Sequence, residues 1–121
     1  MTGSRDLAIA AARAAAGKQA SQIVILDVRE LIGITDYFVI ASGTTDRQVR
    51  TVAEEVERAI KAQGVKPVRR EGEREGRWVL LDFVDFVAHV FRAEERGYYD
   101  LERLWSDAPR VEWEEAAARS G

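Results

Sequence analysis

Residues 78–91 hold two apolar segments separated by a short acidic break, and this pattern constrains the fold more than any other in the chain. The first segment begins at Trp78, the second ends at Phe91, and Asp85 lies in the break between them. Two runs rich in β-branched and aromatic residues on either side of so short a break indicate adjacent antiparallel strands. Neither run alternates cleanly between apolar and polar positions. We therefore expect both strands to be central in a sheet and covered on both faces.

The chain before this hairpin alternates between helical and strand-like patterns. An alanine-rich segment follows Ser4, whose side chain we expect to cap a helix. A second helix is predicted after Thr45, which with Gln48 fits a capping box and precedes apolar residues at helical spacing. Other segments are short, apolar and β-branched, as strands are. The expected helices span residues 4–16 and about 45–63, and the expected strands span residues 23–28, 36–42 and 65–70.

This order of elements predicts an α/β (α+β) fold, with a mixed sheet of about five strands flanked by helices. Pro67 lacks a backbone N–H, so we expect its strand to lie at an edge of the sheet. The charged residues 69–77 have nearly balanced signs, which is typical of a solvated hairpin loop. A chain of 121 residues is long enough for one domain. We predict a single domain over residues 1–108 and a weakly ordered tail over residues 109–121.

The amino-acid composition of the chain excludes several classes of function. The chain has no Cys, a formal net charge of −3 at pH 7 and a pI of about 5.3. Nucleic acids are bound mainly by clustered Lys and Arg, so the acidic balance argues against RNA or DNA as the main contact and favours a basic protein partner. No apolar run approaches the roughly 20 residues of a membrane span. The first residues do not resemble a signal peptide, and we expect a cytoplasmic protein without membrane contact.

Two constellations invite a catalytic interpretation. Asp27, Asp82 and Asp85 could hold metal ions in a nucleotidyltransferase-like site. Asp82 and Asp85, however, flank a predicted tight turn, where Asp is common for structural reasons. His89 is the only histidine. With no Cys and no second His, a metal site rich in nitrogen or sulfur is excluded, and we expect no metal or cofactor. Nothing in the spacing supports Ser42 as a nucleophile served by His89.

The end of the predicted domain is aromatic and acidic. We predict a helix over residues 98–105, in which Leu101, Leu104 and Trp105 share one side. These three residues could simply pack on the sheet. Tyr98 and Tyr99, however, precede them among several acidic residues, and exposed aromatic side chains are common anchors of protein interfaces.

Several segments together resemble the ribosomal silencing factor family (RsfS, also called Iojap-related). They run in order from about Leu7 to Ala108 and comprise residues 36–43, 46–49, 71–72, 78–82, 89–91 and 99–105. One position departs from the family pattern, because the residue before Asp85 is usually Gly and here is Val84. The segment after Pro109 is expected to lie outside the pattern.

The resemblance implies a non-enzymatic protein with a nucleotidyltransferase-like fold that lacks the catalytic residues. Family members bind the large ribosomal subunit through a basic ribosomal protein on its joining face, the one called L-fourteen. They thereby keep the small subunit from docking and repress translation when nutrients are short, and homodimers are also associated with the family. The alternative from the residues is a nucleotide-binding or nucleotidyltransferase-like enzyme that uses Asp82 and Asp85.

The expected partner-binding patch combines aromatic anchors with acidic residues. Strand alternation places Trp78, Leu80 and Asp82 on one face, whereas the position of His89 relative to them depends on the strand register. The predicted patch consists of Trp78, Leu80, Asp82, His89, Phe91, Tyr98, Tyr99, Glu102 and Trp105.

Overall fold

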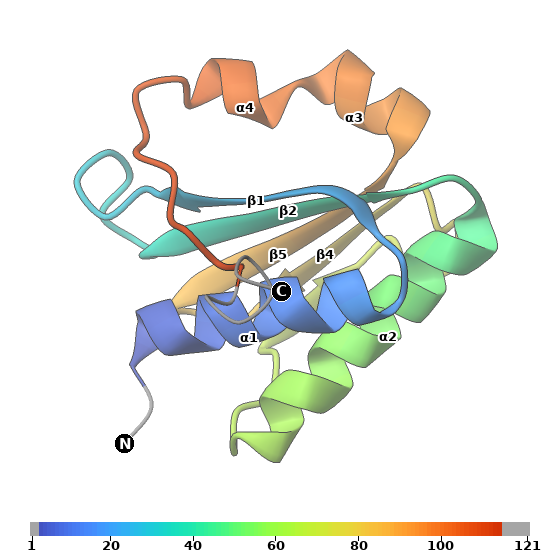
Figure 1. Cartoon of the computed structure of the whole chain (residues 1–121), viewed down its shortest axis with the longest axis horizontal. Coiled ribbons are helices and arrows are strands. Elements are labelled where there is room, and N and C mark those ends of the chain that lie inside the picture. Colours follow the sequence, from blue (N-terminus) through green and yellow to red (C-terminus); the bar gives the residue numbers. More distant parts are fainter. Residues whose placement is uncertain (1–2, 115–121) are drawn as a thin grey trace.

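The computed structural model describes residues 3–114. It contains one five-stranded mixed sheet with helices on both faces (Figure 1), which confirms the predicted fold class. The elements in chain order are α1 (Ser4–Gly17), β1 (Ser21–Asp27), β2 (Tyr37–Gly43), α2 (Asp46–Ala62), β3 (Arg69–Glu71), β4 (Trp78–Asp82), β5 (Phe86–Arg92), α3 (Ala93–Tyr99) and α4 (Leu101–Leu104).

The strands lie in the order β1-β2-β5-β4-β3. The central pair, β2 and β5, is parallel, and the three other neighbouring pairs are antiparallel. β4 and β5 form the predicted hairpin, in which Leu80 lies directly opposite His89 and Trp78 opposite Phe91. Directly opposed residues of an antiparallel pair point to the same face. His89 therefore shares a face with Trp78 and Leu80, and the register question is resolved.

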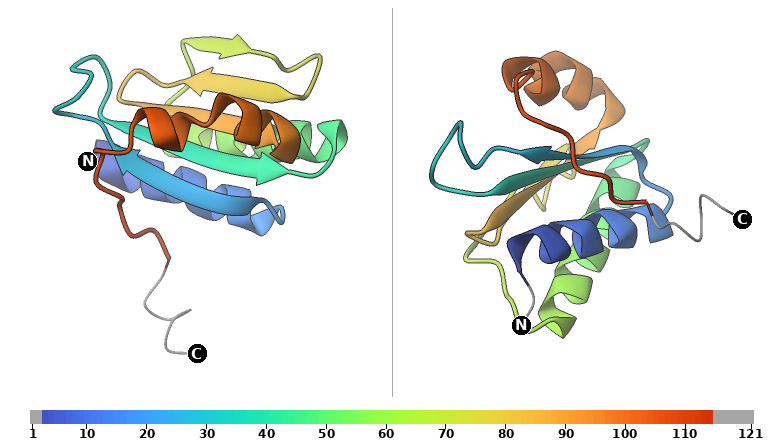
Figure 2. Two further views of the ribbon diagram at one scale, coloured as in Figure 1. Left: turned by 90° about the horizontal axis from the view of Figure 1, so that it is seen from above. Right: turned by 60° about the vertical axis from the view of Figure 1, so that its left-hand side comes forward.

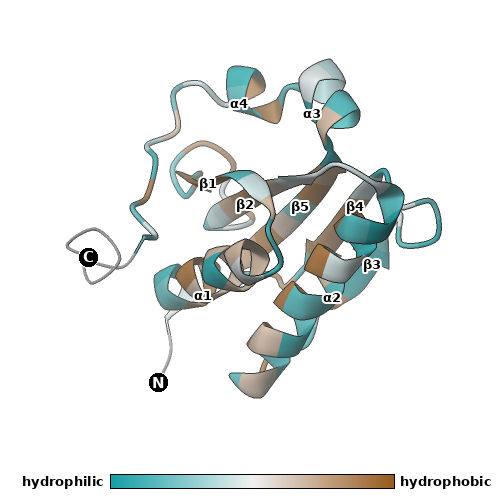
Figure 3. Ribbon diagram, turned by 45° about the vertical axis from the view of Figure 1, so that its right-hand side comes forward, coloured by the Kyte–Doolittle hydropathy of each residue, from teal (hydrophilic) through white to brown (hydrophobic). Residues whose placement is uncertain are grey.

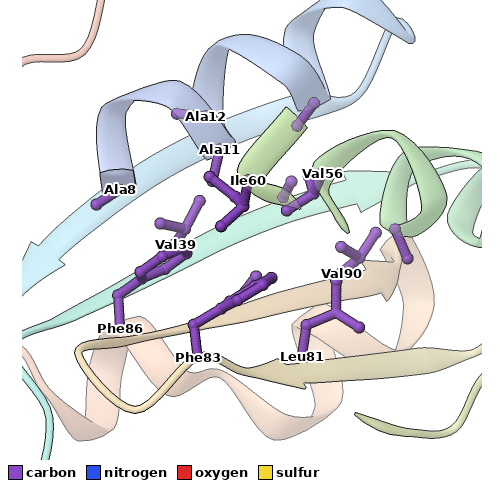
Figure 4. Close-up of a cluster of buried hydrophobic side chains, with 14 of the residues drawn as sticks. Ala8, Ala11, Ala12, Val39, Val56, Ile60, Leu81, Phe83, Phe86 and Val90 are labelled. Carbon is purple, nitrogen blue, oxygen red and sulfur yellow. The ribbon is translucent and has the colours of Figure 1, made fainter. Parts of the chain in front are cut away.

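Helices α1 and α2 cover one face of the sheet and form the main core with it. Small residues of α1, among them Ala8 and Ala11, are fully buried and let this helix approach the strands closely. Figure 3 shows that α2 carries hydrophobic residues along one side and hydrophilic residues along the other. Thr45 caps α2 by accepting a hydrogen bond from Gln48 N–H at 3.0 Å. Side chains of this core are drawn in Figure 4 and include Val39, Val56, Ile60, Leu81, Phe83, Phe86 and Val90.

Two boundary predictions near the start and middle of the chain are wrong. Ser4 does not cap α1, because the N-cap position belongs to Gly3, and Ser4 Oγ instead donates to Asp36 Oδ2 at 2.8 Å. The edge strand begins at Arg69, later than predicted, and pairs through Glu71 with β4. Its late start follows Pro67, whose missing N–H delays regular pairing.

The predicted helix over residues 98–105 is also wrong in its bounds. The helical segment begins directly after β5, where acidic Glu94 and Glu95 occupy the first turn of α3 and suit the positive end of the helix dipole. Asp100 then adopts a left-handed conformation, with φ of 47° and ψ of 58°, and separates α3 from α4. Of the predicted apolar stripe, Leu101 and Trp105 pack against the sheet, whereas Leu104 is exposed.

Residues 109–113 run along the outer edge of β1. Asp27 N–H donates to the Pro109 carbonyl at 2.8 Å, and Val111 N–H donates to the Ile25 carbonyl at 2.9 Å. The Trp113 indole N–H donates to the Ile23 carbonyl at 3.1 Å. A domain boundary at residue 108 stays a prediction, and the predicted weak order of residues 115–121 lies outside the described residues. Between residues 3 and 114, no helix is long and apolar enough to cross a bilayer.

The tip of the β4–β5 hairpin is strained at Val84. Phe83 N–H donates to the Phe86 carbonyl at 2.9 Å, which leaves Val84 and Asp85 as a two-residue loop. Val84 has a φ of 75°, a region that L side chains, and β-branched ones most of all, adopt at a cost. Asp82 Oδ1 supports the loop by accepting from Val84 N–H at 2.9 Å. Asp82 thus acts as a turn residue.

We expect Val84→Gly to raise the free energy of unfolding by about 1 kcal/mol. The left-handed strain costs about 1–2 kcal/mol, and the greater backbone freedom of Gly in the unfolded chain offsets about half of this. Urea denaturation followed by circular dichroism measures the change. Val68→Gly is the matched control, since Val68 is also exposed but has no positive φ. It should lower stability, and a loss of stability in both variants would contradict the strain argument.

Candidate functional site

The face of the sheet opposite α1 and α2 is only partly covered. Seen from above in Figure 2, α3 and α4 lie along the middle of the sheet and leave β4 and β3 uncovered. A groove of about 440 Å³ lies over the uncovered part. It is lined by Ile32, Ile34, Thr35, Phe38, Arg69, Leu80, Asp82, Val84, Val87 and His89.

An aromatic cluster joins this groove to helix α3. The Trp78 ring stacks on Phe91 with centroids 4.8 Å apart, and the Tyr99 ring lies 4.6 Å from Trp78 and 6.3 Å from Phe91. Phe38 meets His89 edge to face at 5.0 Å and Trp105 at 6.2 Å. Offset and edge-to-face pairs of this kind stabilise by about 0.5–1.5 kcal/mol each beyond the buried area. The cluster therefore fixes the position of the α3–α4 segment on the sheet.

His89 lies at the centre of this arrangement. The Trp78 indole N–H donates to His89 Nδ1 at 3.1 Å. Because an indole can only donate, Nδ1 carries no proton and the neutral ring is protonated at Nε2. The side chain is buried, and this burial lowers the pKa of His89 to about 4. At neutral pH the ring is thus uncharged and offers one N–H donor, which has no hydrogen-bond partner within residues 3–114.

The outer surface of the α3–α4 segment is exposed and apolar in places. Tyr98 is 83% exposed and contacts only the Tyr99 ring, at 5.1 Å, among the aromatic residues of the described chain. Leu104 is 68% exposed on the next helix. Tyr98 is therefore open to solvent, whereas Trp78 is half-buried and its ring contacts that of Tyr99.

Glu102 points away from the groove into an internal ion-pair network. Arg96 is 6% exposed; its Nε donates to Glu102 Oε1 at 3.0 Å, and its Nη1 donates to Ser42 Oγ at 2.8 Å. Glu102 Oε2 lies 3.7 Å from Arg110 Nη2. This network ties α3, α4 and the segment after α4 to the end of β2.

The residues of the predicted patch are thus divided among four neighbouring locations. Leu80, Asp82 and His89 line the groove. Trp78, Phe91, Tyr99 and Trp105 belong to the aromatic cluster, while Tyr98 and Glu102 lie on the outer surface and in the ion-pair network.

Sequence reasoning missed Thr35, Phe38, Arg69 and Arg96. The sequence pattern placed Phe38 in a strand but did not indicate its neighbours. Its position beside His89 depends on the parallel pairing of β2 with β5. Arg96 lies in a segment of mixed charge, and nothing in that pattern indicates that its side chain is buried. The residues of the connector before β2 offered no periodic pattern at all.

The described residues contain no cluster of side chains that could bind a metal ion. Within residues 3–114, no group of three or more His, Cys, Asp or Glu side chains could hold a metal ion. The Asp85 carbonyl accepts from Asp36 N–H at 2.9 Å, so Asp85 joins the hairpin tip to the start of β2.

The family model "Ribosomal silencing factor during starvation" (RsfS) matches residues 2–121. The chain belongs to this family. The match extends beyond Pro109, so the expectation that this segment lies outside the family pattern is wrong. Members of this family are named ribosomal silencing factors, so the chain belongs to a family of translation regulators.

Curated relatives and a solved structure agree with this assignment. The ribosomal silencing factor RsfS of Halalkalibacterium halodurans is 42% identical over 110 residues, which are 91% of this chain and 94% of the relative. The RsfS of Bacillus subtilis is 45% identical over 99 residues, 82% of this chain and 84% of the relative. A crystal structure of a Chromobacterium violaceum protein superposes with a TM-score of 0.84 at 33% identity, covering 87% of this chain and 88% of that one.

Proposed function

We propose that this RsfS chain binds the large ribosomal subunit through a basic protein on its joining face, L-fourteen, and thereby blocks association with the small subunit. In the cell this would repress translation under nutrient shortage. The action requires no chemistry, because a bound domain of this size excludes the small subunit from any contact patch that it occupies.

The main support for this proposal is the half-covered face of the sheet. It presents an apolar groove, a neighbouring aromatic cluster and the exposed Tyr98 in one continuous region. Interfaces typically have such an apolar and aromatic centre. Asp82 at the groove, together with the net charge of −3, suits a basic partner and should speed its association. The homodimer implied by the resemblance stays a prediction that sedimentation velocity can test.

Co-sedimentation with purified ribosomal subunits tests the proposal. We expect the protein to travel with the large subunit and not with the small one. When both subunits are mixed under joining conditions, the joined-particle peak should shrink as the protein is added. Isolated L-fourteen should compete for the protein and restore joining.

Three results would count against the proposal. Binding to the small subunit alone, or to neither subunit, removes the ribosomal role of this chain. Binding to the large subunit without loss of joined particles removes the steric block. Binding that L-fourteen does not compete for removes that protein as the partner.

A further inference from the structure

Two residues that line the groove each carry a buried polar atom that no group within residues 3–114 satisfies. His89 Nε2 and Thr35 Oγ1 both have almost no solvent exposure, and neither has a hydrogen-bond partner within the described residues. Most buried polar atoms of folded proteins are paired, and leaving one unpaired costs about 1–3 kcal/mol. Two such groups in one groove indicate a place for a ligand that brings its own hydrogen-bonding atoms.

The protonation of His89 specifies what kind of atom is missing. Trp78 occupies Nδ1, so Nε2 carries the only ring proton and can only donate. The missing partner is therefore an oxygen acceptor. Thr35 Oγ1 can donate or accept, and so it is compatible with either a carbonyl or an amide of the same ligand.

The surroundings of these two groups specify the class of ligand. Ile32, Ile34, Phe38, Leu80, Val84 and Val87 give the groove a mostly apolar lining. Arg69 is already paired with Glu71 at 3.1 Å, and Asp82 adds a negative charge that repels phosphates. A peptide segment satisfies all of these conditions, because it carries apolar side chains beside backbone carbonyl oxygens, and a basic residue in it can lie near Asp82.

We propose that the groove binds an extended segment of the protein partner that places an apolar side chain between Ile34 and Val87 and a carbonyl oxygen on His89 Nε2. This rests on the proposed function and adds the mode of recognition. Thr35 supplies the second polar contact. Trp78 is a positioning residue, since it fixes the His89 tautomer and does not face the groove. A rotamer change of a lining side chain, common at interfaces, gives the carbonyl access to Nε2.

His89→Phe is the variant that tests this hydrogen bond. It keeps a ring of similar shape but removes the donor, so the partner carbonyl is left unpaired in the complex. We expect its affinity for purified large subunits, measured by co-sedimentation, to fall by about tenfold or more. The melting temperature should change by less than about 5 °C, because loss of the Trp78 bond is offset by removal of an unpaired buried N–H.

If His89→Phe folds poorly, a second pair of variants still tests the proposal. Thr35→Val preserves shape while removing the hydroxyl, and it should also weaken subunit binding several-fold. Thr51→Val is its matched control on α2, a half-buried residue on the opposite layer, and should bind normally.

The possible outcomes distinguish failure of the groove proposal from failure of the proposed function. If the wild-type protein binds large subunits and both folded variants bind equally well, the groove proposal is overturned while the proposed function stands. If the wild-type protein binds no subunit, the proposed function fails and the groove proposal fails with it. Weaker binding of the folded variants, with Thr51→Val unchanged, supports both.

Discussion

Replacing Arg96 with methionine is expected to lower the free energy of unfolding by about 2–3 kcal/mol. The guanidinium is 6% exposed and bonds to both Ser42 Oγ and Glu102. Breaking a buried ion pair costs about 3–5 kcal/mol when the remaining charge is fully buried. Glu102 keeps some contact with water, which reduces the loss. Urea denaturation monitored by tryptophan fluorescence measures the effect.

Arg103→Met serves as the control for this variant. Arg103 lies on the neighbouring helix α4 and is exposed, so its replacement should change stability by no more than about 0.5 kcal/mol. Arg96→Met should also loosen the α3–α4 segment and weaken subunit binding. A stability loss below about 0.5 kcal/mol for Arg96→Met would mean that the network does not hold this segment.

Leu80→Arg is expected to reduce affinity for the large subunit by about 30-fold or more. Leu80 lies in the groove directly opposite His89, and its side chain is half-buried. Loss of a central interface residue commonly costs about 2 kcal/mol or more, which corresponds to about 30-fold in affinity. An added positive charge in the groove also repels a basic partner. Co-sedimentation over a range of protein concentrations measures the change.

Ala62→Arg adds the same positive charge away from the groove, so it controls for the effect of the changed net charge on binding. Ala62 is exposed at the end of α2, on the layer that covers the opposite face of the sheet. This variant should bind as the wild-type protein does. Equal losses for the two variants would show that overall charge, and not the groove, governs binding. Leu80→Arg should melt within a few degrees of the wild type, because the long Arg stem can cover the apolar surface that Leu80 covered.

The fold was largely predictable because its strands and α2 carry strong local patterns. The run from Trp78 to Phe91 defined the hairpin, and the Thr45 cap defined the start of α2. Element bounds failed where a single residue overrode the pattern. Asp100 interrupts the last helix through a left-handed backbone conformation, which no periodicity of the neighbouring residues indicates.

The candidate site was predictable only in part. Alternation placed Trp78, Leu80 and Asp82 on one face, since period-two patterns are local. The groove itself depends on pairing between distant strands, which brings Phe38 beside His89. Burial of Arg96 likewise results from where α3 crosses the end of β2. Such contacts depend on how distant segments pair in the folded protein, and local sequence patterns do not indicate that pairing.

The parallel pairing of β2 with β5 has a consequence for folding during synthesis. The sheet cannot be completed until Arg92, the last residue of β5, has left the exit tunnel, because β5 joins the β1–β2 hairpin to β4 and β3. Until then β2 exposes an unpaired, strongly apolar edge, and nonlocal pairings of this kind form slowly. The nascent chain is thus most exposed to aggregation over the interval in which α2, β3 and β4 are being made.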